Sequence, residues 1–116
     1  MLSYKRSDRL GEQIKEEIAD IIMHKIHDPR IGFVTVTHVD LSDDLKNAKV
    51  YISILNDSAK KGDTISGLIS AAGFIRSELR KRLRIRYIPE LLFKIDDSIK
   101  EGVRMVKILD DLEKEE

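Results

Sequence analysis

The sequence predicts a single α+β domain in which helices pack on one face of a small β-sheet. Two stretches, residues 8–27 and 63–86, carry apolar residues at helical spacing. Three shorter stretches alternate apolar and polar residues, as strands do when they bury one face. The chain of 116 residues is long enough for one hydrophobic core, and it contains no cysteine for disulfides or thiolate metal sites.

The first helix is predicted over residues 8–27. Ser7 or Asp8 is expected to cap its start, and Asp28-Pro29 to end it, because the residue before a proline disfavours the helical conformation. His27 lies near the C-terminal end, where a positive charge interacts favourably with the helix dipole. The side that faces the core carries apolar residues three or four apart, namely Leu10, Ile14, Ile18, Ile21, Ile22 and Ile26.

Two strands of a β-hairpin are predicted over residues 33–39 and 48–55, joined by a polar connection. In the first strand, Val34 and Val36 alternate with Phe33, Thr35 and Thr37. In the second strand, one face consists of Val50, Ile52 and Ile54, and the other of Lys49, Tyr51 and Ser53. The second face is expected to contact solvent.

Residues 63–86 are predicted to form two helices that meet at Ala71-Ala72-Gly73, with Asp63 or Thr64 as the first cap. A glycine inside a helix costs about 1 kcal/mol relative to alanine, so Gly73 is interpreted as a kink, a break or a close backbone approach. Phe74 is expected to be turned into the core by this kink, with stacking on an unpaired base as the alternative. The predicted core residues are Leu68, Ala72, Ile75, Leu79 and Leu83.

Residues 90–96 are predicted to form a third strand, with Phe93 and Ile95 on one face. Ser98 and Glu101 have the spacing of a capping box at the start of a last helix. Its apolar side consists of Ile99, Val103, Val106, Leu109 and Leu112. Apart from this added C-terminal helix, the element order matches that of a type II KH domain. One domain is predicted over residues 1–116, with frayed termini at about 1–6 and 113–116.

The formal net charge of zero conceals a strong asymmetry. Residues 76–86 contain six basic residues against the single acid Glu78, whereas residues 108–116 contain five acids against one lysine. A charged run is usually a solvated face, but this one is nearly uncompensated, and arginine pairs well with phosphate oxygens. The predicted RNA-binding residues are Arg76, Arg80, Lys81, Arg84 and Arg86, together with a second basic group, Lys5, Arg6 and Arg9, expected on the same surface. Arg82 is set apart because it points nearer the apolar side.

Other polar residues are interpreted as structural. His24 and His27 have the spacing of a metal pair but lack an evident third ligand, and the acidic residues Asp40, Asp43, Asp44, Asp96 and Asp97 suit turns and caps. We therefore expect no metal and no cofactor. A ribonuclease would need a general acid and base, and His38 alone lies away from the first helix. Tyr51 and Tyr87 are weaker candidates for RNA contact. No membrane span or signal-peptide core is evident, so a cytoplasmic location without membrane contact is expected.

Several motifs in combination resemble the bacterial ribosome-binding factor A family. These are DPR-x-G before the first strand, DL-x-x-A-x-VY into the second, GFIR, and the PEL and DDS runs, and the likeness extends from about Arg9 to Leu109. The resemblance implies a KH-like fold in which Ala71-Ala72-Gly73 replaces the glycine loop. It also implies a factor without enzymatic activity that binds the small (30S) ribosomal subunit and promotes maturation of 16S rRNA, including in the cold.

The sequence departs from RNA-binding KH modules in general, because no GxxG loop occurs between the central helices. Phosphate contact through the basic helix is therefore expected in place of the usual backbone clamp. The expected partners are the small subunit and the 16S rRNA precursor, bound by a monomer that takes no small-molecule substrate. The alternative is a KH-like RNA-binding or protein-interaction module that is not tied to the ribosome.

Overall fold

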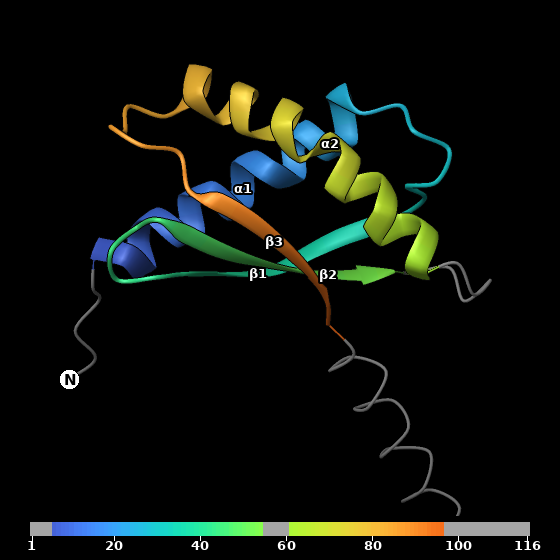
Figure 1. Ribbon diagram of the computed structural model, residues 1–116, viewed down its shortest axis with the longest axis horizontal. Coiled ribbons are helices and arrows are strands. Elements are labelled where there is room, and N and C mark those ends of the chain that lie inside the picture. The colour runs from blue at the N-terminus through green and yellow to red at the C-terminus, as the bar shows by residue number, and fades with distance from the viewer. Residues whose placement is uncertain (1–5, 55–60, 97–116) are drawn as a thin grey trace, which may run out of the picture.

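The structure is a computed structural model, and it describes residues 6–54 and 61–96 (Figure 1). It contains helix α1 (Arg6–Lys25), strands β1 (Val34–Leu41) and β2 (Asn47–Ile54), helix α2 (Lys61–Arg82) and strand β3 (Glu90–Ile95). The predicted α+β class is confirmed, and the order helix, strand, strand, helix, strand is consistent with a KH-like fold. The predicted capping box and last helix, as well as Lys5, lie outside the described residues.

The sheet has three strands in the order β1-β2-β3, with β2 in the middle. Strand β1 pairs with β2 antiparallel, as the predicted hairpin requires, and β3 pairs with β2 parallel. Both helices lie over the same side of this sheet (Figure 1). A parallel pair needs a crossover connection, and α2 provides it.

One hydrophobic cluster joins the helices to the inner face of the sheet, and it confirms the predicted helical and strand spacings. Fully buried members are Ile14, Ile18 and Ile21 from α1, Val50 and Ile52 from β2, and Leu68, Ile75 and Leu79 from α2. Burying a side chain of this size contributes roughly 1.5–3 kcal/mol relative to leaving it exposed. The cluster therefore fixes the position of α2 over the sheet.

A β-bulge interrupts strand β1 between Val36 and His38. The alternation predicted for Val34 and Val36 holds up to this point, after which the inward residues are Val39 and Leu41. The extra residue, Thr37, donates a hydrogen bond of 2.6 Å from its hydroxyl to the Asp96 carboxylate beyond the end of β3. This hydrogen bond therefore links β1, at one edge of the sheet, to the residue that follows β3, at the opposite edge.

The prediction of two separate helices is wrong, because α2 is one unbroken helix from Lys61 to Arg82, whereas the expected change of direction is present (Figure 1). Its axis changes direction near the middle (Figure 1). Gly73 has no positive φ, and a Cβ placed there would meet nothing within 4 Å. The helix continues through the glycine because fully buried Leu68 and Ile75 anchor it on either side. Neither a backbone break nor a close approach explains this glycine.

Phe74 was predicted to be a core residue, and this prediction is wrong, because 45% of the residue is exposed. The bend in α2 does not turn its side chain inward. Ser53 also differs from expectation: it lies on the outer face of β2 but is buried, because a small side chain on the middle strand is covered by its neighbours. Phe33 precedes β1 rather than belonging to it and is 78% exposed.

The helix boundaries differ from the predicted ones by a few residues. Helix α1 begins at Arg6, so the proposed caps Ser7 and Asp8 lie inside it, and it ends at Lys25 before His27. Helix α2 begins at Lys61, upstream of the proposed caps Asp63 and Thr64. The Thr64 hydroxyl instead donates a hydrogen bond of 3.2 Å to the Arg30 carbonyl. Thr64 therefore joins α2 to the α1–β1 connection instead of capping the helix.

The connection between α1 and β1 is held by Asp28 and Arg30 and packs against α2. The Asp28 carboxylate accepts hydrogen bonds from the Arg30 backbone N–H at 2.9 Å and from its guanidinium at 2.7 Å. These bonds lower the pKa of Asp28 below its usual value. On α2, a Cβ at Gly67 would lie only 2.8 Å from Cγ1 of Ile31. Glycine at this position allows the connection to approach the helix closely.

Candidate nucleic-acid interface

The predicted basic residues at the end of α2 include two exposed arginines. Arg80 lies on the last turns of α2 and Arg84 follows the helix, and both are exposed. Among residues 6–54 and 61–96, no hydrogen-bond or ion-pair partner is found for either guanidinium. Lys81 is 70% exposed and lies 3.4 Å from the Glu78 carboxylate, three residues earlier. This helix end therefore presents cationic groups that an external anion can reach.

Arg76 has a different environment. Its Nε donates to the Pro89 carbonyl and its Nη2 to the Ile88 carbonyl, both at 3.1 Å. The Glu90 carboxylate lies 3.5 Å from Nη1, and 31% of the Arg76 side chain is exposed. This guanidinium holds the segment that enters β3 against α2. RNA contact by Arg76 stays a prediction, and it would have to compete with these bonds.

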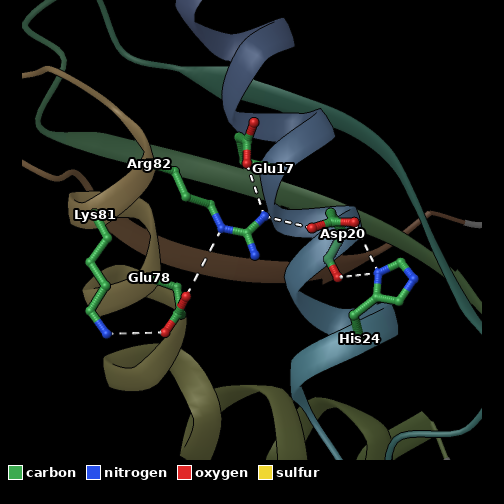
Figure 2. A network of polar contacts seen from close by, with 6 residues as sticks. All are labelled: Glu17, Asp20, His24, Glu78, Lys81 and Arg82. Carbon is green, nitrogen blue, oxygen red and sulfur yellow. Dashed lines mark hydrogen bonds and ion pairs between the residues drawn. The ribbon is translucent and has the colours of Figure 1, made fainter.

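Arg82 lies at the centre of a polar network between the two helices (Figure 2). Its guanidinium approaches Asp20 to 2.6 Å, Glu17 to 3.0 Å and Glu78 to 4.0 Å. The hydrogen bond that Asp20 accepts from Arg82 lowers the pKa of Asp20, and the hydrogen bonds that Arg82 donates to Asp20 and Glu17 raise the pKa of Arg82. The charge of Arg82 is thus compensated within the fold.

The second basic group is only partly described. Arg6, at the start of α1, lines a groove together with Arg86, which follows α2. Arg9 is exposed on α1, and Lys5 lies outside the described residues. The Arg86 guanidinium carbon lies 5.4 Å from the centre of the Tyr87 ring, within the range of a cation–π contact. The fold therefore brings two of the predicted residues, Arg6 and Arg86, to one end of the molecule.

This groove has a volume of about 630 Å³. Its walls come from the first turns of α1, the β1–β2 turn and the segment between α2 and β3, which gather at one end of the domain (Figure 1). Sequence reasoning did not find its contributors Leu45 and Lys46. Leu45 has a positive φ of 63°, which no sequence pattern predicts for a leucine. Their place in the groove depends on tertiary packing.

A smaller hollow of about 390 Å³ lies beside the middle of α2. Ala71 and Phe74 line it from α2, and the end of α1 with the Asp28-Pro29 turn lines it from the other side. Ala71, Ala72 and Gly73, predicted as the kink, therefore stand beside an accessible depression.

Several other candidates have structural surroundings. Asp44 accepts hydrogen bonds from the Ser42 hydroxyl at 2.6 Å and the Lys46 N–H at 3.0 Å, as predicted for a turn aspartate. The Nδ1 of His24 lies 2.9 Å from the Asp20 carboxylate. The rings of His38 and Tyr51 stack with centroids 5.9 Å apart. In the described part of the chain, no three His, Asp or Glu side chains converge as metal ligands.

Within the same residues, neither helix is long and apolar enough to cross a membrane.

The fold and its charges define a small α+β domain with KH-like element order and a cationic end. The chain belongs to the ribosome-binding factor A family, whose model matches residues 6–109. Ribosome-binding factor A of Desulfitobacterium hafniense strain DCB-2 is 50% identical over 111 residues, which cover 96% of this chain and 89% of the relative.

Solved structures agree with this assignment. The crystal structure of ribosome-binding factor A from Thermus thermophilus superposes with a TM-score of 0.70 at 28% identity, over 77% of this chain and 93% of that one. A homology model of the Thermus thermophilus factor, fitted into a cryo-EM map of a 30S complex of that protein, gives a TM-score of 0.64 at 28% identity. That comparison covers 75% of this chain and 91% of the other.

Proposed function

We propose that this protein binds the immature small (30S) ribosomal subunit and promotes maturation of its 16S rRNA. It binds as a monomer in the cytoplasm and catalyses no reaction itself. Its family membership and the 30S complex of the Thermus thermophilus factor support this proposal. Support for growth in the cold is a further expectation from the family resemblance.

The observation that carries the proposal is the exposed pair Arg80 and Arg84, for which no partner is found among the described residues. Arginine binds phosphate oxygens through two parallel hydrogen bonds, so a solvent-facing guanidinium is well suited to an RNA backbone. The cations Lys81 and Arg86 lie within two residues of this pair and extend the positive surface. Such a surface recognises charge and shape rather than base sequence.

The test is to reverse both charges in the double variant Arg80→Glu, Arg84→Glu and to measure co-sedimentation with immature small subunits over a range of salt concentrations. Each phosphate contact that is lost reduces the slope of log affinity against log salt by roughly 0.7–0.9. We therefore expect weaker binding and a slope reduced by roughly 1.4–1.8. Melting should change little, because exposed charges contribute under about 1 kcal/mol each.

The matched control is Lys49→Glu, Lys94→Glu, which changes the net charge equally on the outer face of the sheet. Both lysines are exposed on strands β2 and β3. The control should keep most of the binding and of the salt dependence. If the arginine variant is folded and binds subunits as tightly as the unmodified chain, the surface around Arg80 and Arg84 is only solvated. The proposed mode of binding would then be wrong.

A further inference from the structure

We propose that the groove beside Tyr87 receives one unpaired nucleotide of the ribosomal RNA. The inference rests on the proposed function, and it adds a stacking site to the phosphate contacts. We name this feature the Tyr87 groove, lined by Arg6 and Leu10 of α1, Asp44, Leu45 and Lys46 of the β1–β2 turn, and Ile85, Arg86, Tyr87, Ile88 and Glu90 around the entry to β3.

The apolar part of the groove can accept a flat hydrophobic ring. Leu10, Leu45 and Ile85 are half-buried, and Ile88 is buried. Tyr87 is 69% exposed and lies between half-buried Ile85 and buried Ile88, so its ring is open to solvent beside packed aliphatic side chains. An aromatic ring beside aliphatic side chains is the surface on which nucleic-acid bases stack.

The charges around the groove favour an anionic ligand. Arg6, Lys46 and Arg86 contribute three cations. The two carboxylates already have partners within the fold: Asp44 accepts from Ser42 and from the Lys46 N–H, and Glu90 lies 3.5 Å from Arg76. With three cations against two carboxylates, the lining keeps a net charge of +1, which favours the phosphates on either side of a nucleotide.

The combination of ring and cations indicates a nucleotide that is unpaired. A paired base has both faces covered by its stacked neighbours, whereas an unpaired base can place one face on Tyr87. The volume of about 630 Å³ lies within the range of small-ligand sites and does not accommodate a double helix. One RNA strand would then run from α2 into the groove. Its phosphates would contact the arginines, and one of its bases would stack on the Tyr87 ring.

The groove is formed before any ligand arrives. Leu45 keeps its positive φ of 63° because its N–H donates to the Ser42 carbonyl at 2.9 Å and its side chain packs on the core. The Glu90 N–H donates to the Lys46 carbonyl at 2.8 Å, which joins the β1–β2 turn to the start of β3. Two walls of the groove are therefore fixed to each other, so ligand binding costs the protein little conformational entropy.

The decisive experiment compares Tyr87→Ala, Tyr87→Phe and Tyr51→Ala in small-subunit binding across a salt series. Loss of one base–aromatic stack weakens binding by about 5- to 150-fold. We expect this loss for Tyr87→Ala with an unchanged salt slope, because stacking releases no counterions. Tyr87→Phe keeps the ring and should bind within about twofold of the unmodified chain. Tyr51→Ala removes a ring from the outer sheet face and should leave affinity unchanged.

The variants also separate the possible failures. If Tyr87→Ala binds as tightly as the unmodified chain while Arg80→Glu, Arg84→Glu binds weakly, the groove proposal is wrong and the proposed function stands. If Tyr51→Ala loses affinity and Tyr87→Ala does not, the base stacks on the sheet face instead. If Tyr87→Phe loses as much as Tyr87→Ala, the hydroxyl rather than the ring is recognised, and stacking is refuted.

Discussion

The side of α2 that flanks the core and the side that faces away from it contain the same residue types in different roles. Arg76 and Arg82 border the buried residues and bind other parts of the fold, whereas Arg80 is exposed without a partner in the described residues. Gly67 lies close against the α1–β1 connection, whereas Gly73 faces open space. Residue type alone therefore does not separate structural from functional positions on this helix.

What separates them is the chemistry within reach of each side chain. Arg76 meets two backbone carbonyls and Arg82 meets three carboxylates, so their hydrogen bonds are satisfied inside the molecule. Among the described residues no partner is found for Arg80 or Arg84, so both guanidinium groups are available to water and external anions. An arginine-rich run can therefore contain some arginines that stabilise the fold and others that are free to bind external ligands. The substitutions below test this distinction.

The largest effect is expected from Gly67→Ala. The new methyl group would lie 2.8 Å from Cγ1 of Ile31, so the α1–β1 connection or the helix must shift. Overpacking of this kind costs about 1–3 kcal/mol, more than the gain from replacing glycine by alanine in a helix. Urea unfolding followed by circular dichroism measures the change. Unaltered stability would mean that displacing Ile31 costs no more than the helix gains from alanine.

Arg76→Ala is expected to have the next largest effect on stability. It leaves the Ile88 and Pro89 carbonyls without their donor, at a cost of about 1–2 kcal/mol. The matched variant Arg80→Ala should unfold within about 0.5 kcal/mol of the unmodified chain. Chemical denaturation of both variants checks the pair. Equal losses would place Arg76 and Arg80 in one class and break the comparison.

Gly73→Ala should stabilise the protein by up to about 1 kcal/mol. The position is helical, has no positive φ and has room for a Cβ, so only the entropic benefit of alanine remains. Thermal melting measures the gain. A destabilised variant would indicate that the bend in α2 needs glycine after all. Subunit binding by the same variant reports whether the open space over Gly73 is used by a partner.

The smallest effect is expected from Asp20→Asn under acidic conditions. Because Arg82 lowers the pKa of Asp20 in the folded state, the pair stabilises the fold fully above the unfolded value near 3.8. This contribution is lost as the pH falls through the lower folded pKa. The stability difference between the two proteins should therefore be present at pH 6 and shrink below pH about 4. A difference that grows with acidity would contradict the assigned direction.

Much of the fold followed from the sequence because burial imposes periodicity. Residues such as Ile14, Ile18, Val50 and Leu79 were predicted as core from their spacing alone, and all are fully buried. The bulge at Thr37 was not predicted, since one extra residue in a strand leaves no local signal beyond a shifted alternation. The unbroken α2 was missed because the anchoring of Gly73 on both sides is a tertiary effect.

The candidate site was less accessible to sequence reasoning. The basic run itself was visible, but the engagement of Arg76 depends on carbonyls twelve and thirteen residues away in the chain, and that of Arg82 on acids in α1. The Tyr87 groove is built from three segments that only folding brings together. Sequence patterns locate charge and apolar surface, whereas the partners of each side chain are set by the three-dimensional arrangement.

The mixed pairing of β2 has a consequence for the order of folding. Its antiparallel partner β1 is joined to it by a short turn, whereas its parallel partner β3 aligns Glu90 with Asn47 only after the whole of α2 has intervened. Closing a short loop costs less entropy than closing a long one, so the hairpin should form first and β3 should dock late. Substitutions at Val39 should then slow folding, and substitutions at Phe93 should mainly speed unfolding, in stopped-flow kinetics. The opposite pattern would show that the parallel pair nucleates the domain.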